Sequence, residues 1–192
     1  MLPHITNSEA GRNKYEVLYK NIFEVMFTLP DMIAKNFGSD SALITEHVLS
    51  VGGLDALDKS PEAGTTQKFM GTTRTYLNSG VDDTSAEITI KLSLNLRNAV
   101  DNYIYKIFRA WSKLGYDIET GEKVALKKDY TADYLQISIG NRVGDIYRRI
   151  IFKDVILSKI NGGLSDLDYT SMSEPMEMEI TLKSDWWKDE IV

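Results

Sequence analysis

The chain contains no cysteine and only two histidines among its 192 residues. Without cysteine, disulfide bonds and thiolate catalysis are excluded, while the redox compartment stays open. The histidines, His4 and His47, lie far apart, in a polar N-terminal stretch and in an expected strand. Zinc sites commonly need three or four ligands, and no cluster supplies them. We therefore predict no metal site, no histidine-based catalytic site and no cofactor.

Long apolar runs are also missing. No stretch approaches the roughly 18 apolar residues that a membrane-spanning helix requires, and no basic start leads into an apolar segment. We expect a soluble protein, made in a cytoplasm and not inserted in a membrane. The net charge of −6 argues against an outer surface that grips nucleic acid, because such a surface needs clustered basic residues.

The motifs of common enzyme sites are absent. Gly52-Gly53 and Gly162-Gly163 lack the lysine and the spacing of a phosphate-binding loop. Asp166 and Asp168 are not followed by the glycine and glutamate of a calcium loop. Arg148-Arg149 lies within an expected strand, so the two side chains point to opposite faces and form no common basic patch. We predict that the chain is not an enzyme.

The clearest pattern present is a period of two over residues 85–96. Such alternation predicts a strand with one buried and one exposed face. One face carries Ala86, Ile88, Ile90, Leu92, Leu94 and Leu96, and the other carries Glu87, Thr89, Lys91, Ser93 and Asn95.

One helix is predicted after this strand. Its apolar residues recur with a period near 3.6, Asn98 suits the N-cap, and Gly115 suits the end. Trp111 lies on the apolar stripe, and Trp186-Trp187 stand near the C-terminus. We expect these three tryptophans to pack the last strand on the helix, with an interface anchor as the alternative.

The remaining pattern favours a mainly β protein with one packed helix, arranged as a small barrel or sandwich. We expect one domain over residues 1–192, with an N-terminal arm at 1–20 and loop insertions at 31–44 and 54–68. Further strands are expected at residues 21–29, 42–51, 68–77, 134–139, 147–160 and 176–182. Few residues protect the edges of these strands, so the sheet must close on itself or pair with other copies.

The order of these elements resembles the tail tube proteins of contractile-tailed bacteriophages, which are related to the tube proteins of contractile injection and type VI secretion systems. The resemblance spans about residues 20–187. It rests on Asn21-Ile22-Phe23-Glu24-Val25, on Gly121-Glu122 and Lys127-Lys128 after the helix, on Phe152-Lys153-Asp154-Val155, on Glu179-Ile180-Thr181-Leu182, and on Asp185-Trp186-Trp187.

The resemblance implies hexameric rings whose strands join in a shared inner β-barrel. The rings would stack into a hollow tube inside a contractile sheath, with baseplate and tail terminator proteins as further partners. Double-stranded DNA would pass through without specific binding, and the protein would be assembled in the host cytoplasm and reside in the virion tail. Residues 85–96 and 68–77 would supply the barrel, with Glu87, Thr89, Lys91, Ser93 and Asn95 facing the lumen or a neighbour.

Two alternatives remain. A baseplate tube initiator or a secretion-system tube protein would share the fold. A monomeric small-molecule-binding β-barrel would instead need an apolar pocket with a few convergent polar groups.

Overall fold

The computed structural model describes eight segments of the chain: residues 19–37, 41–57, 63–77, 85–96, 101–117, 119–121, 126–162 and 175–192. The strands are β1 (Phe23–Phe27), β2 (Val48–Gly52), β3 (Ala63–Phe69), β4 (Thr72–Leu77), β5 (Ala86–Ser93), β6 (Ala132–Gly140), β7 (Ile146–Asn161) and β8 (Glu177–Ile191). The helices are α2 (Asp31–Phe37), α3 (Ser41–Glu46), α4 (Tyr103–Gly115) and α5 (Lys127–Tyr130), with a 3-10 turn, η1 (Leu54–Leu57).

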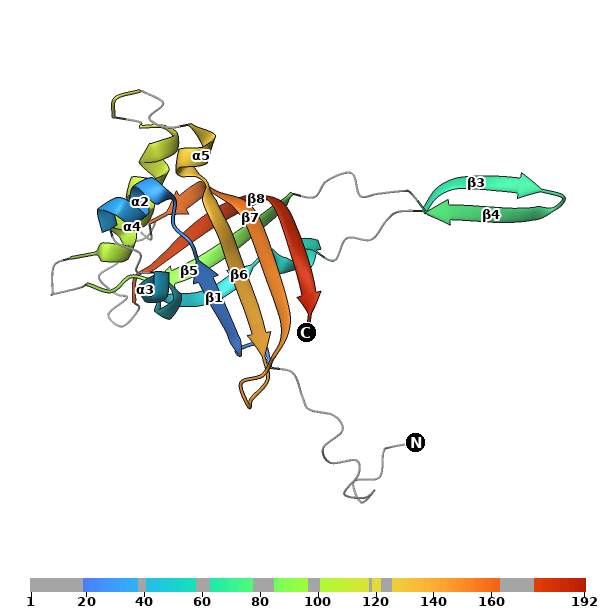
Figure 1. The fold of residues 1–192 in the computed structure, drawn as a ribbon, viewed down its shortest axis with the longest axis horizontal. Helices are drawn as coiled ribbons and strands as arrows, with labels where there is room; N and C mark the ends of the chain where they lie inside the picture. The colour runs from blue at the N-terminus through green and yellow to red at the C-terminus, as the bar shows by residue number, and fades with distance from the viewer. Residues whose placement is uncertain are drawn as a thin grey trace, which may run out of the picture.

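Six strands form one antiparallel sheet in the order β1-β6-β7-β8-β5-β2. The sheet curls into a nearly closed barrel (Figure 1), which leaves β1 and β2 as its two edges. Helix α3 packs beside β1 and leads directly into β2, and the Thr45 hydroxyl donates to the carbonyl of Val25 over 2.6 Å. A helix thus bridges the gap between the edges, which reduces the exposed edge of β1.

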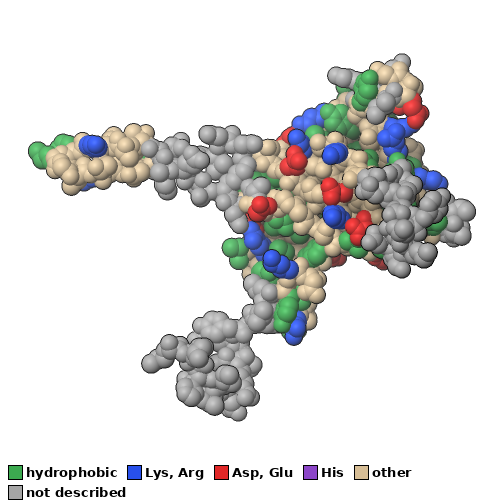
Figure 2. Space-filling view, turned by 180° about the vertical axis from the view of Figure 1, so that it is seen from behind, with side chains coloured by type: hydrophobic (Ala, Val, Ile, Leu, Met, Phe, Trp, Pro, Cys, Tyr) green, Lys and Arg blue, Asp and Glu red, His purple; other side chains and the backbone are tan. Residues whose placement is uncertain are grey.

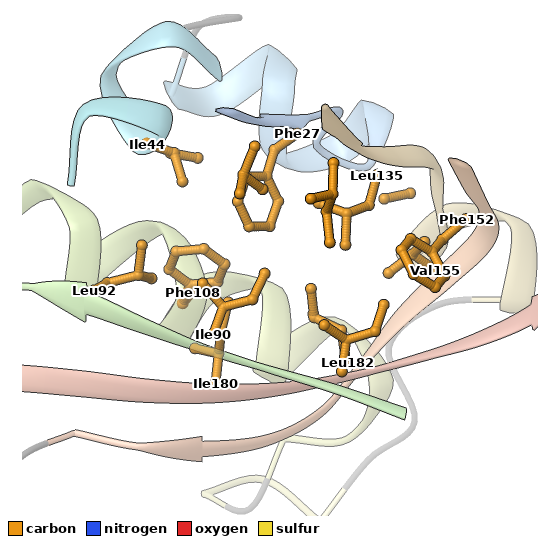
Figure 3. Packing of buried hydrophobic residues seen from close by; sticks show 14 of the residues in the cluster. Phe27, Ile44, Ile90, Leu92, Phe108, Leu135, Phe152, Val155, Ile180 and Leu182 are labelled. Carbon is orange, nitrogen blue, oxygen red and sulfur yellow. The ribbon is translucent and has the colours of Figure 1, made fainter. Parts of the chain in front are cut away.

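The core fills the inside of this barrel. Alternate residues of β5 and of the first half of β8 point inward and are buried, and they meet side chains from β1, β6 and β7 (Figure 3). The inward set includes Phe27, Ile88, Ile90, Leu92, Leu135, Ile137, Phe152, Val155, Ile180 and Leu182. Such packing explains the alternation over residues 86–93, whereas Leu96, which was predicted to lie on the buried face, is 60% exposed beyond the end of β5.

Helix α4 closes one end of the barrel. The side-chain oxygen of Asn102 accepts from the amide of Tyr105 at its N-terminus, and the apolar stripe is buried. Phe108 meets Phe27 edge to face, with 6.2 Å between ring centroids. The Trp111 indole donates to the carbonyl of Tyr130 in α5 over 2.6 Å. The predicted helix is confirmed from residue 103 onward, but its N-cap is Asn102 and not the predicted Asn98. Residues 97–100 lie outside the described segments.

The structure confirms three further strand predictions, and the expected strand at 21–29 contains β1. The expected strand at 147–160 is β7, and the strand at 134–139 is the centre of β6. Arg148 and Arg149 face opposite sides, because Arg148 forms an ion pair with Asp189 while Arg149 lies opposite Glu190 in the ladder. The last strand was predicted to end at residue 182, but β8 continues to Ile191. The polar second half of β8 pairs with β7. This half has no alternation of apolar and polar residues, so the sequence did not predict it.

Several local predictions were wrong. The loop insertion at 31–44 contains α2 and the start of α3, and the first half of the strand at 42–51 is α3. The carbonyl of Pro30 accepts from Ile33 and Ala34, which starts α2, and six or seven residues are too few to display a helical period. The insertion at 54–68 contains η1 and most of β3.

The single strand at 68–77 is also wrong, because residues 63–77 form a hairpin. Strands β3 and β4 meet at Met70-Gly71 and make a separate two-stranded sheet. The hairpin projects from the barrel (Figure 1). The turn at Met70-Gly71 is hard to recognise in the sequence, because the threonines on both sides favour a strand and methionine is unusual in a tight turn.

Candidate assembly surfaces

The outward face of β5 carries four of the residues predicted to face a lumen or a neighbour. Glu87, Thr89, Lys91 and Ser93 alternate with the buried apolar residues and point away from the core. Each lies opposite a polar residue of β8, and Lys183 forms an ion pair with Glu87 over 3.2 Å. The result is a polar, mixed-charge surface. Its role in assembly stays a prediction.

The fifth predicted residue, Asn95, lies beyond the end of β5. Its side-chain amide is 3.2 Å from His47 Nδ1 and 3.3 Å from the hydroxyl of Ser93, and His47 Nδ1 lies 3.2 Å from that same hydroxyl. This triangle ties the residue before β2 to the end of β5. His47 therefore helps to join β2 to β5 at the edge of the sheet.

The three tryptophans occupy different environments. Trp111 is 2% exposed and belongs to the core, and Trp187 is partly buried and packs against the core beside Phe152. Trp186 points to the outer face and is 43% exposed, so it takes no part in the expected packing of strand on helix. Successive residues of a strand face opposite sides, which separates the pair.

An outer row beside Trp186 was not predicted. Trp186 lies opposite Lys153, which lies opposite Tyr134, and Met26 is exposed on the adjoining position of β1. Only the register of four strands brings these residues together, and the sequence holds no signal for it.

Two charged groups on this outer surface have displaced pKa values. The side-chain hydrogen bond with Asp185, followed by the charge of Asp185, raises the pKa of Lys127. The side-chain hydrogen bond with Lys188 lowers the pKa of Glu190. Both pairs are solvent-exposed and of the kind that contributes little to stability. Neither indicates an acid or base prepared for catalysis, and no group of three or more potential metal ligands occurs among the described residues.

The β3–β4 hairpin is the most exposed element. Phe69 is 69% exposed and Met70 is 90% exposed, and both lie at its far end, where Figure 2 shows hydrophobic side chains. Met70 has φ +45° and Gly71 has φ +79°. Positive φ at both central residues is the signature of a type I′ turn, which favours Asn-Gly rather than Met-Gly.

A cavity of about 450 Å³ opens at the other end of the barrel from α4. It lies where β1 and β7 begin and where β2 and β6 end. Its apolar walls come from Phe23, Val51, Leu54, Ile137 and Ile139, and its polar groups include Lys20 and Asp55. Tyr19, another wall residue, lies under the guanidinium of Arg142 at 4.1 Å.

Within the described residues, no helix combines the length and apolar character needed to cross a membrane.

No protein-family model matches the sequence, and no curated protein is detectably similar to it. Solved structures of similar fold include chains of three cryo-EM structures. A chain of the PVC sheath–tube complex of an extracellular contractile injection system, in the extended state, has 15% identity and a TM-score of 0.55; 97% of this chain and 100% of that chain are covered. A chain of the sheath/tube terminator of the same system has 16% identity and a TM-score of 0.53, with 93% and 99% covered.

The third structure is the tube-terminating cap of the anti-feeding prophage, with 13% identity, a TM-score of 0.52, and 96% and 100% of the two chains covered. At identities of 13% to 16%, the similarity shows a shared fold and does not show a shared function. It extends over nearly the whole of each chain, so the expected fold class, mainly β with a barrel-like sheet, is confirmed, although the described residues form α2, α3 and α5 in addition to the expected helix α4.

Proposed function

We propose that this chain is a structural, non-enzymatic subunit of a contractile tail tube. Hexameric rings of the chain stack into a hollow conduit inside a sheath, and a phage genome passes through it. In this arrangement the polar outer face of β5 lines the lumen or meets a neighbour, and α4 lies toward the sheath. Baseplate and terminator proteins lie at the two ends of the tube.

The observation that carries this proposal is the projecting hairpin on a tube-type barrel. An isolated two-stranded hairpin is at best marginally stable in water. Strands β3 and β4 make a sheet of their own, and the described side chains from 65 to 76 are exposed. Such an element gains its stability from a partner, which supports a protein that works by assembly. The names of the similar structures, a sheath–tube complex and its terminator, support the same role.

A tube terminator or cap is the second candidate, because two of the similar structures carry that description. Such a protein forms rings but does not extend them. A baseplate initiator or a secretion-system tube protein would also form rings of this fold. The monomeric ligand-binding barrel is less well supported, because buried side chains of the described strands fill the barrel interior.

The test is size-exclusion chromatography with negative-stain electron microscopy over a concentration series of purified protein. We expect six-fold rings and hollow filaments. Rings that never lengthen would favour the terminator. A protein that stays monomeric even with an added baseplate would contradict the proposal.

A further inference from the structure

We propose that the end cavity of the barrel binds an uncharged, largely aromatic small molecule. This activity is separate from the proposed assembly role, because the residues that form the cavity all belong to one chain. Small-molecule sites are usually cavities of roughly 300–1,000 Å³ with apolar walls and a few polar groups, and the mouth of a β-barrel is a common place for them. The end cavity, at about 450 Å³, has the volume, the walls and the position of such a site.

The cavity follows from the way in which the sheet fails to close. Strands β1 and β2 are the two edges of the six-stranded sheet. Helix α3 bridges them at one end only, where the Thr45 hydroxyl donates to the carbonyl of Val25. At the other end the cavity lies between Phe23 of β1 and Val51 of β2. The cavity is therefore the stretch of the gap between β1 and β2 that α3 does not cover.

The edge of β1 directs backbone groups into this gap. The carbonyl of Ile22 accepts from Gly140 and the amide of Thr28 donates to Tyr134, so the even-numbered residues bond to β6. Antiparallel strands bond through alternate residues, and the backbone groups of Phe23 therefore point away from β6 and toward the gap. The backbone N–H and C=O of Phe23 suit one polar group of a ligand.

This short edge favours a small molecule over a peptide. Val25 also directs its backbone toward the gap, but its carbonyl accepts from Thr45 of α3. Phe23 is the residue of the β1 edge that lines the cavity. A peptide that adds a strand to a sheet pairs over several residues, and one edge residue beside the cavity does not provide that length.

The side chains of the lining select an apolar ligand that contains rings. Aromatic rings favour edge-to-face or offset contacts with other rings, which contribute beyond the burial of apolar area. The guanidinium of Arg142 lies 4.1 Å from the centre of the Tyr19 ring and helps to position it. The aromatic residues of the lining are Tyr19, Phe23 and Tyr147, and the aliphatic ones are Val51, Leu54, Ile137 and Ile139.

The two charged residues of the lining disfavour a ligand with a net charge. Lys20 and Asp55 have opposite charges and both line the cavity. A cation is attracted by one and repelled by the other, and an anion likewise, so neither sign gains. A charge brought against the apolar walls also loses its hydration without a dedicated partner. An uncharged ligand avoids both costs.

Two fluorescent probes that differ by one charged group test this selectivity. N-phenylnaphthylamine is uncharged, and anilinonaphthalene sulfonate has the same ring system with one negative charge. Both become brighter in apolar surroundings. In titrations of the purified full-length protein, we expect the uncharged probe to bind one site per chain. The anionic probe should bind about tenfold more weakly or worse, because its charge must be desolvated.

A cavity-filling variant tests the location. Val51→Trp places an indole in the cavity and should weaken binding of the uncharged probe by about tenfold or more, because it takes the volume that the probe needs. Leu49→Trp is the matched control, with the same new side chain on the same strand. Leu49 is 47% exposed and does not line the cavity, so this variant should bind the probe as the wild type does.

A chemical block tests the location without a change in the apolar wall. The chain has no cysteine, so Asp55→Cys can be modified with a bulky maleimide after folding. Asp55 is exposed, and the modified protein should no longer bind the uncharged probe. Lys35→Cys, at an exposed position of α2, is modified with the same reagent as the control and should bind normally. This measurement decides the matter even if Val51→Trp does not fold.

Three results would overturn the proposal: no binding of the uncharged probe to the wild type, equal affinity for the two probes, or binding that survives the block at residue 55. Equal effects of a variant and its control would place the probe elsewhere on the protein and would overturn it too. None of these results bears on tube assembly, which electron microscopy of the wild type tests separately.

Discussion

At the scale of single residues, Gly53 has the strictest requirement. It lies between β2 and η1 with φ +84°, and a Cβ added there would lie 2.4 Å from the carbonyl oxygen of Glu87. Gly144, in the turn between β6 and β7, has φ +99° but open space around it. Both need a left-handed backbone, and only Gly53 also needs a missing side chain. The sequence shows a Gly-Gly pair at 52–53, but not which glycine touches β5.

We predict that Gly53→Ala destabilises the protein more than Gly144→Ala. The left-handed backbone should cost each variant roughly 1–2 kcal/mol. Gly53→Ala should lose about 1–3 kcal/mol more, because the added methyl group forces the backbones apart. Urea unfolding of monomeric protein measures both. Equal losses would show that the close approach to Glu87 is not present.

At the scale of elements, the visible patterns were those with enough residues to show a period. β5 alternates over its eight residues, and α4 carries an apolar stripe through thirteen. In contrast, α2, α3 and η1 have only seven, six and four residues, and the buried side chains described in them are Ile33, Ile44 and Leu57. The predicted packing of three tryptophans on one interface failed for Trp186, since adjacent strand residues cannot both face the helix.

We predict opposite outcomes for two tryptophan substitutions. Trp111→Phe removes the hydrogen bond to Tyr130 and leaves a small void in the core, at a cost of about 2 kcal/mol. Trp186→Phe on the outer face should change stability by less than about 0.5 kcal/mol. Chemical denaturation followed by circular dichroism, which does not depend on the lost indole, measures both. A large loss for Trp186→Phe would mean that this side chain is buried.

At the scale of the whole molecule, the barrel buries its own core, while the hairpin and the outer row are exposed. Residues 1–18 lie outside the described segments, so the N-terminal arm stays a prediction. It was expected from a polar, mixed stretch with Pro3 and Gly11 that has no apolar period. Segments of this composition commonly become ordered on binding.

We predict that deletion of residues 1–13 leaves a folded subunit but impairs polymerisation. Circular dichroism and thermal melting should match those of the full chain, because the core begins at Val25. Filament length and yield, counted by electron microscopy, should fall. Unaltered tube growth would exclude a role for the arm.

The sequence by itself determined the fold class, the inward and outward faces of β5, and the helix that closes the barrel. These properties follow from periodicity, which depends on neighbours along the chain. Only the tertiary structure decided the rest: the Met70-Gly71 turn in its exposed hairpin, the row of Tyr134 and Trp186, and the cavity between residues 51–55 and β6. Each depends on strand register or on contacts between distant segments, and pairing energy of that kind leaves no local pattern in the sequence.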